Sequence, residues 1–109
     1  KHPIVCRDTP GFVVNRILLP IMGDVVNLWD QGLASAQDID DACRMGLNWP
    51  IGPLALCDLV GLDVAVHATE ALYESTREPK HAPAPAMVRM VKAGKLGRKS
   101  GEGFYSYGA

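Results

Sequence analysis

The feature that most constrains the fold is a long apolar segment that runs from about Pro10 to Gln31. Its hydrophobic residues recur with helical spacing, and at about 100° per residue they fill an arc of roughly 200°. They are Val14, Ile17, Leu18, Leu19, Ile21, Met22, Val25, Val26, Leu28 and Trp29. A single core needs a stripe only about 100° wide. We therefore expect this helix to have two apolar neighbours, one of which can be another chain or domain.

Asn15 is the one polar residue inside this apolar arc, where it falls between Met22 and Val26. A buried amide without a hydrogen-bond partner costs about 1 to 3 kcal/mol, so we expect a partner for it. One interpretation is that the amide bonds a neighbouring loop or a backbone carbonyl of the protein itself. The other is that it faces a substrate. Periodicity alone does not choose between the two.

Local signals mark both ends of this first helix. Asp8 or Thr9 can cap its first turn, and Pro10 fits there because its missing N–H would have had no partner. Gly32 predicts the end of the helix in a left-handed cap. Pro20 lies inside the segment and leaves one carbonyl without its usual donor, so we expect a kink there.

Four further helices are predicted downstream, each bounded by glycine, proline or a capping residue. They run from about Ala36 to Met45 after a cap at Ser35, from Gly52-Pro53 to Val60, from a cap at Asp63 to Arg77, and from Pro85 to Gly94. Five helices with short connections predict an all-α domain. The one β-like run is Ile4 to Cys6, which we expect to be a strand that continues from something upstream, since a lone strand is not stable.

Composition and charge exclude several classes of function. The 109 residues are 48% hydrophobic and 21% charged, with a formal net charge of -1. These values fit one globular domain and indicate neither a nucleic-acid partner nor a membrane surface. Cys6, Cys43 and Cys57 are odd in number and lie in apolar contexts, which is typical of reduced thiols in the cytoplasm. The histidines and cysteines are too scattered to predict a metal site.

His67 is the first candidate for a general base because it is the one histidine inside a predicted helix. Asp63, Glu70 and Glu74 share its polar face, opposite the apolar residues of the same helix. This pattern predicts a solvated surface histidine.

The glycine-rich tail from Gly94 to Gly103 has the composition of a phosphate loop but matches neither the P-loop nor the dinucleotide-binding pattern. We call the four cations in this tail or just before it the tail cations. They are solvated, or they meet the phosphates of a ligand such as coenzyme A. They are Lys92, Lys95, Arg98 and Lys99. The aromatic residues beside glycine and proline anchor loops on the core more often than they form a ligand platform. They are Trp49, Phe104, Tyr105 and Tyr107.

Four blocks of sequence, in order, carry a resemblance to a known family. They are Asp8-Thr9-Pro10-Gly11-Phe12-Val13-Val14-Asn15-Arg16, then Ala34-Ser35 through Asp38-Ile39-Asp40, then Gly52-Pro53-Leu54-Ala55-Leu56-Cys57-Asp58-Leu59-Val60-Gly61-Leu62-Asp63, and Leu96-Gly97-Arg98-Lys99-Ser100-Gly101-Glu102-Gly103-Phe104-Tyr105. Together they resemble the C-terminal domain of NAD-dependent 3-hydroxyacyl-CoA dehydrogenases over essentially the entire chain. The last two blocks are most similar to the bacterial 3-hydroxybutyryl-CoA dehydrogenases.

The resemblance implies the five-helix C-terminal domain of the 6-phosphogluconate dehydrogenase-like enzymes. Residues 1–8 would then be a connecting strand from an N-terminal Rossmann domain that holds NAD, and residues 9–109 a substrate and dimerisation domain. The implied enzyme interconverts (S)-3-hydroxyacyl-CoA, with 3-hydroxybutyryl-CoA as the expected substrate, and 3-oxoacyl-CoA. It would be a cytoplasmic homodimer of fatty-acid and butanoate metabolism.

In that family a histidine oriented by a glutamate removes the substrate proton, and both residues belong to the N-terminal domain. The resemblance therefore assigns this chain no catalytic, cofactor-binding or metal-ligating residue, and we expect the isolated chain to be inactive. The one substrate-binding residue that it carries over is Asn15, near the acyl end of the substrate. Two alternatives stay open: a purely structural oligomerisation module, and the same fold in a sugar-acid dehydrogenase.

Overall fold

The computed structural model describes Pro3, Val5, Arg7 and residues 13–108 of the chain, and these residues form five α-helices and two short 3-10 helices. The elements are α1 (Val14–Asp30), α2 (Ala36–Gly46), α3 (Pro53–Val60), α4 (Leu62–Thr76), η1 (Pro79–His81), α5 (Pro85–Lys92) and η2 (Arg98–Ser100). Within the described residues, β structure is limited to two isolated bridges in the tail. The prediction of an all-α domain with five helices is confirmed.

Two predictions fall on residues outside this description. The cap expected at Asp8 or Thr9 lies there, and so do Ile4 and Cys6 of the expected strand; Val5, the described residue between them, is not in a strand. The described part of the first helix begins at Val14, with Val13 in the capping position. The strand and the cap therefore stay predictions.

Local signals account for most of the helix boundaries. The Ser35 hydroxyl accepts a hydrogen bond of 3.1 Å from the backbone N–H of Asp38, as the capping pattern predicts. Gly32 takes the left-handed conformation, with φ of 81°, directly after α1. α1 contains Pro20 and continues through it to Asp30.

The predicted cap of α4 at Asp63 is wrong. Gly61 occupies the capping position with φ of 108°, and Asp63 lies in the first turn of the helix. Its carboxylate instead binds Lys99, whose Nζ lies 2.9 Å from Oδ2. The reason is that Gly61 alone supplies the positive φ that the sharp turn between α3 and α4 requires.

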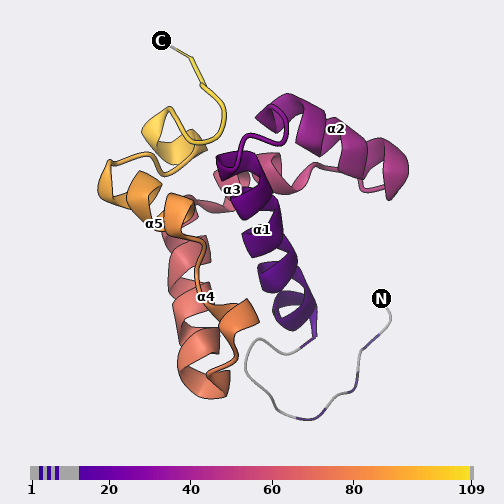
Figure 1. Ribbon diagram of the computed structural model, residues 1–109, viewed down its shortest axis with the longest axis vertical. Coiled ribbons are helices and arrows are strands. Elements are labelled where there is room, and N and C mark those ends of the chain that lie inside the picture. The colour runs from indigo at the N-terminus through magenta and orange to yellow at the C-terminus, as the bar shows by residue number, and fades with distance from the viewer. Residues whose placement is uncertain (1–2, 4, 6, 8–12, 109) are drawn as a thin grey trace.

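α1 is the central helix, and it contacts α2, α3, α4, α5 and η1. Figure 1 shows α1 and α4 running beside each other, with α2, α3 and the C-terminal tail at one end and α5 packed against α4. The core fills the space between these helices. Its large buried side chains are Leu19, Met22, Val25, Val26, Ile39, Leu54, Leu62, Val66, Leu72 and Met87.

Only part of the wide apolar arc of α1 is covered within the described chain. Met22 and Val26 are 3% and 0% exposed, whereas Val14 is 70% and Ile17 is 59% exposed. The most exposed residues of the arc lie at the beginning of the helix, and Leu28 near its end is also exposed. This half of the arc is the part for which the sequence predicts a neighbour beyond this domain.

Candidate functional site

Asn15 lies in the first turn of α1, directly after Val14 in the sequence and two residues before Ile17, whose side chains are both exposed. The residue itself is exposed, and no described residue hydrogen-bonds its amide. The described residues therefore do not support the interpretation in which the Asn15 amide bonds a neighbouring loop of this protein. What remains is an exposed amide for which the described residues offer no hydrogen-bond partner, and its role as a substrate contact stays a prediction.

His67 is exposed on the outer face of α4, as predicted. It borders a shallow hollow together with Glu70, Tyr73 and Glu74. The Tyr73 ring already has a cation above it, because the Arg77 guanidinium lies 5.8 Å from the ring centroid. This face is a solvated surface.

Three of the four tail cations have partners within the chain. Lys95 Nζ lies 3.6 Å from a carboxylate oxygen of Glu102, and Arg98 stacks over the Tyr107 ring at 5.5 Å. Lys99 hydrogen-bonds Asp63, and this bond holds the pKa of that carboxyl below its ordinary value. These contacts favour a structural role for the tail cations over phosphate binding.

The most constrained polar groups of the domain are two buried aspartates, neither of which the sequence predicted as buried. Asp40 belongs to α2, but it is 3% exposed and caps a different helix, α3. Its two oxygens accept from the N–H groups of Leu54 at 2.8 Å and Ala55 at 2.9 Å. Gly52 permits this approach, because a Cβ at that position would collide with Asp40.

Asp58, which is 1% exposed, holds the C-terminal tail in the same way. Oδ1 accepts from the N–H of Phe104 at 2.9 Å, and Oδ2 accepts from the N–H of Tyr105 at 3.0 Å. The Tyr107 hydroxyl donates a third bond, of 2.6 Å, to Oδ2. The Tyr105 hydroxyl reaches Oδ2 of Asp40, also at 2.6 Å. We call these two carboxylates and the two tyrosines the tail clamp.

The tail clamp suppresses ionisation of its phenols. Burial, followed by the hydrogen bond to Asp58, raises the pKa of Tyr107 to about 12. Burial and the bond to Asp40 likewise raise the pKa of Tyr105. Phe104 completes the attachment, since its ring meets Trp29 edge-to-face with centroids 5.0 Å apart. For these tail aromatics, the expectation that they anchor a loop on the core is confirmed.

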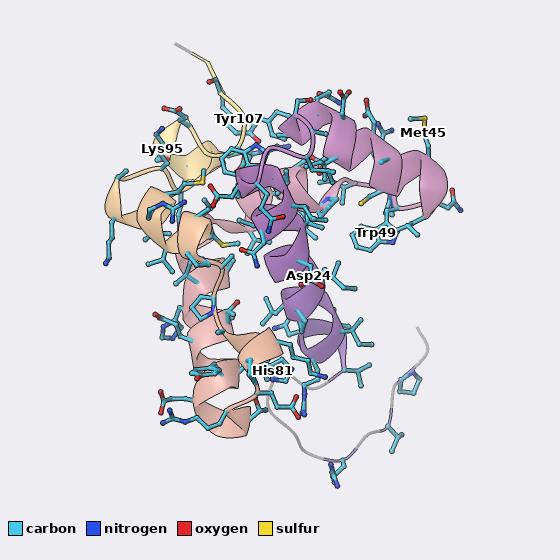
Figure 2. All side chains as sticks on the ribbon, viewed as in Figure 1. Asp24, Met45, Trp49, His81, Lys95 and Tyr107 are labelled. Atoms are coloured by element: carbon cyan, nitrogen blue, oxygen red, sulfur yellow. The ribbon has the colours of Figure 1, made fainter. Side chains whose placement is uncertain are left out.

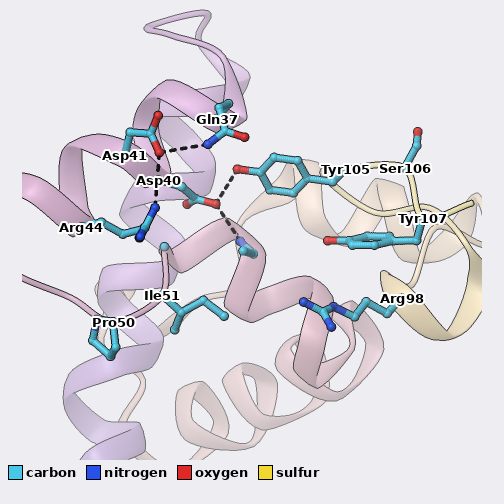
Figure 3. A pocket seen from close by; sticks show the side chains of 12 residues that line it. Gln37, Asp40, Asp41, Arg44, Pro50, Ile51, Arg98, Tyr105, Ser106 and Tyr107 are labelled. Carbon is cyan, nitrogen blue, oxygen red and sulfur yellow. Dashed lines mark hydrogen bonds and ion pairs between the residues drawn. The ribbon is translucent and has the colours of Figure 1, made fainter.

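A hollow of about 430 Å³ lies beside the tail clamp, between α2 and the tail (Figure 3). Its wall carries both signs of charge: Arg44 lies 3.9 Å from Asp41, which also accepts a hydrogen bond from Gln37. Asn15 is not among its lining residues. The hollow and the predicted substrate contact are therefore separate features.

Sequence reasoning missed His81, which it passed over because the residue lies in a proline-rich segment between helices. The ring is 2% exposed, and Nδ1 lies 2.5 Å from the Thr76 hydroxyl. Its place at the end of η1 is labelled in Figure 2. A histidine flanked by Pro79 and Pro83 gives no periodicity from which its burial could be predicted.

Neither a metal site nor a membrane span is found in the described part of the chain. No group of three or more His, Cys, Asp or Glu residues there could hold a metal ion. No helix described here is long and apolar enough to cross a membrane. Cys43 and Cys57 are free thiols, and burial raises the pKa of Cys57 to about 12.

The described residues thus define an all-helical domain with an exposed apolar surface and a firmly attached tail. The sequence profile of the family described as "3-hydroxyacyl-CoA dehydrogenase, C-terminal domain" matches residues 11–107. The chain belongs to this family and corresponds to its C-terminal domain.

Relatives and solved structures agree with this assignment. The chain is 44% identical over 108 residues to the human mitochondrial hydroxyacyl-coenzyme A dehydrogenase, a match that covers 98% of this chain and 34% of the relative. It is 45% identical to a probable 3-hydroxybutyryl-CoA dehydrogenase of Deinococcus radiodurans, over 98% of this chain and 38% of the relative. The crystal structure of (S)-3-hydroxybutyryl-CoA dehydrogenase from Ralstonia eutropha superposes with a TM-score of 0.96 at 48% identity, over 100% of this chain and 38% of that one.

The chain therefore spans little more than a third of the length of the relatives that it matches. Those relatives are whole dehydrogenases, and the matched part is the C-terminal domain.

Proposed function

We propose that this chain is the substrate-completing and dimerising C-terminal domain of an NAD-dependent oxidoreductase. The enzyme would interconvert (S)-3-hydroxyacyl-CoA, with 3-hydroxybutyryl-CoA as the favoured substrate, and 3-oxoacyl-CoA. The names of the bacterial relatives support the short-chain substrate. The observation that carries the proposal is the exposed Asn15 amide at the beginning of α1, which lies next to the exposed Val14 and has no hydrogen-bond partner among the described residues.

The chemistry of this surface suits the acyl end of a thioester. Val14, next to Asn15, offers apolar contact to a short acyl chain, while the Asn15 amide can donate to an acyl oxygen. Inside a closed cleft such a bond gains strength, because the surrounding dielectric is low. Asn15 thus orients the substrate, and the proton transfer belongs to groups on the preceding domain.

NAD, when bound, supplies the hydride acceptor of the reaction. The described residues do not fit it themselves, because the glycine-rich tail follows α5, contains only the short helix η2, and has no strand-turn-helix unit. The cofactor is therefore assigned to a Rossmann domain that precedes this chain in the enzyme.

The decisive experiment replaces Asn15 by alanine in the two-domain enzyme and measures reduction of acetoacetyl-CoA by NADH. We expect kcat/KM to fall about tenfold, which corresponds to about 1.4 kcal/mol in the barrier. Asn27→Ala, on the same helix, is the matched control and should leave kcat/KM unchanged. An Asn15→Ala enzyme with normal kcat/KM would remove the assigned role and leave a purely structural module.

Dimerisation is tested separately. Light scattering of the chain at high concentration should report a dimer, and a strictly monomeric species would show that this domain does not dimerise alone. Lack of activity on acetoacetyl-CoA in the wild-type enzyme would favour another substrate, such as a sugar acid. A cytoplasmic location stays a prediction, since the relatives include both bacterial and mitochondrial proteins.

A further inference from the structure

His81 is a buried polar group that the proposed reaction does not use. It ends η1, a short helix that packs against both α4 and α1. In Figure 1, η1 lies beside the first turns of α1, close to the last turn of α4. The ring is therefore placed where three elements meet, and one of them carries Asn15.

The hydrogen bonds around Thr76 define how His81 is held. The Thr76 hydroxyl donates to the Leu72 carbonyl at 3.1 Å and accepts from the backbone N–H of Glu78 at 3.3 Å. A hydroxyl has a single proton, so the contact at 2.5 Å to Nδ1 of His81 is satisfied when Nδ1 carries the proton and donates. The Glu78 carboxylate, 3.9 Å from the same nitrogen, also favours a proton there.

This bond joins the end of α4 to the end of η1 across a tight turn. Arg77, directly after α4, adopts a left-handed conformation with φ of 58°, which reverses the chain toward η1. A non-glycine residue in this region is strained unless neighbouring contacts stabilise it. The His81–Thr76 bond is such a contact, because it spans the strained residue.

The first turns of α1 contribute little buried surface to the core of the described chain, although Leu18 packs partly against it. None of the residues from Val14 to Leu18 is buried, and the first buried side chain of the helix is Leu19. The position of these turns therefore depends on how η1 packs against α1.

We propose that His81 is a positioning residue that holds, through η1, the turns of α1 that present Asn15 to the substrate. This inference rests on the proposed function for its catalytic consequence, but the mechanical link itself is independent of that function. The His81–Thr76 bond fixes η1 on α4, and η1 in turn fixes the beginning of α1.

Hydrogen exchange of the full-length protein tests the mechanical link. In His81→Ala, backbone amides of η1 and of the first turns of α1 should exchange at least about tenfold faster, while those of α2 keep their wild-type rates. His67→Ala, which removes an exposed histidine from α4, is the matched control. Faster exchange confined to η1, with α1 unchanged, would overturn the proposal.

Conservative variants separate positioning from a general loss of stability. His81→Asn keeps an N–H donor near the position of Nδ1, and Thr76→Ser keeps the hydroxyl, so both should retain kcat/KM within about twofold. Thr76→Val replaces only the hydroxyl group by a methyl group, so its exchange rates and its kcat/KM should change in the same way as those of His81→Ala. It keeps the test valid if the alanine variant folds poorly. An equal loss of kcat/KM in Thr76→Ser and Thr76→Val would contradict the positioning role of the His81–Thr76 bond.

The activity readout is the split between kcat and KM. Displacement of Asn15 should lower kcat by about threefold or more, because the amide orients the reacting substrate, with a smaller change in KM. If Asn15→Ala lowers activity but Thr76→Val does not, this inference fails and the proposed function stands. If Asn15→Ala has no effect, the proposed function fails, and hydrogen exchange still decides whether His81 positions the first turns of α1.

The hydrogen-bonding scheme has its own test. Nitrogen-15 NMR should show that His81 carries a proton on Nδ1. A ring that carries its proton on Nε2 alone would overturn the scheme.

Discussion

The Tyr107 hydroxyl donates a hydrogen bond of 2.6 Å to Asp58, a residue 49 positions earlier in the chain whose side chain is almost completely buried. The same carboxylate accepts from the backbone N–H groups of Phe104 and Tyr105. A buried charge is tolerated when it is fully hydrogen-bonded, and here three donors converge on it. The Asp58 carboxylate in α3 thus holds three groups of the C-terminal tail, and the stability of the domain should depend on it.

Replacing Asp58 by asparagine tests this dependence. The amide keeps one acceptor oxygen and turns an NH2 group toward groups that already donate, so partners are lost rather than exchanged. We expect the free energy of unfolding in urea to fall by at least about 2 kcal/mol. Asp41→Asn, on the half-exposed side of α2, should change it by less than about 1 kcal/mol. Similar effects of the two changes would contradict the role of the tail clamp.

Alkaline pH should weaken the tail clamp. Burial and the bond to Asp58 raise the pKa of Tyr107 to about 12 from an ordinary value of 10, so the unfolded chain loses this proton first. The stabilisation is fully present below pH 10 and is lost as the pH rises toward 12. Urea unfolding between pH 9 and about 11.5 measures the decline. Tyr107→Phe should have a lower free energy of unfolding at pH 9 than the wild type, and this free energy should fall less steeply as the pH rises. An identical pH dependence in the two proteins would argue against a contribution from Tyr107.

Two glycines of the domain should respond to alanine in opposite directions. A Cβ on Gly103 would collide with the Asp58 carboxylate, whereas a Cβ on Gly23 in α1 meets nothing within 4 Å. Gly103→Ala should therefore lower the unfolding free energy by about 2 kcal/mol or more. Gly23→Ala should raise it by about 0.5 to 1 kcal/mol, because alanine is the better helix former. Thermal and urea unfolding of the two variants measure both effects, and destabilisation by Gly23→Ala would show that α1 has an unrecognised contact there.

The two halves of the α1 arc should differ in what they contribute to this domain. Met22 is buried in the core, and Ile17 is 59% exposed. Met22→Ala should cost about 2 to 5 kcal/mol of stability, while Ile17→Ala should cost less than about 1 kcal/mol. In the two-domain enzyme, Val14→Ala, in the same exposed half of the arc, should instead raise KM for the acyl-CoA substrate. A large stability loss for Ile17→Ala in this chain would mean that the exposed half of the arc is covered by its own residues.

The candidate site shows how far sequence reasoning extends. The position of Asn15 on the apolar face of the first helix follows from 3.6-residue periodicity, and the exposure of Val14 beside it agrees with a helix that needs a second neighbour. The burial of Asp40, in contrast, does not follow from its neighbours in α2, where the charged residues Asp38 and Arg44 are exposed. Its partners Leu54 and Tyr105 lie 14 and 65 residues further on, beyond the reach of any local pattern.

The sequence by itself determined the helices of this domain, because their boundaries depend on groups within a few residues of one another: the Ser35 cap, the left-handed Gly32, and the prolines that open α3 and α5. Tertiary structure decided which polar groups are buried. Asp58 and His81 are buried because distant segments bring N–H and hydroxyl donors to them, and the energy of a buried polar group depends on whether such partners arrive. Tertiary structure also decided which half of the α1 arc is core and which half is surface.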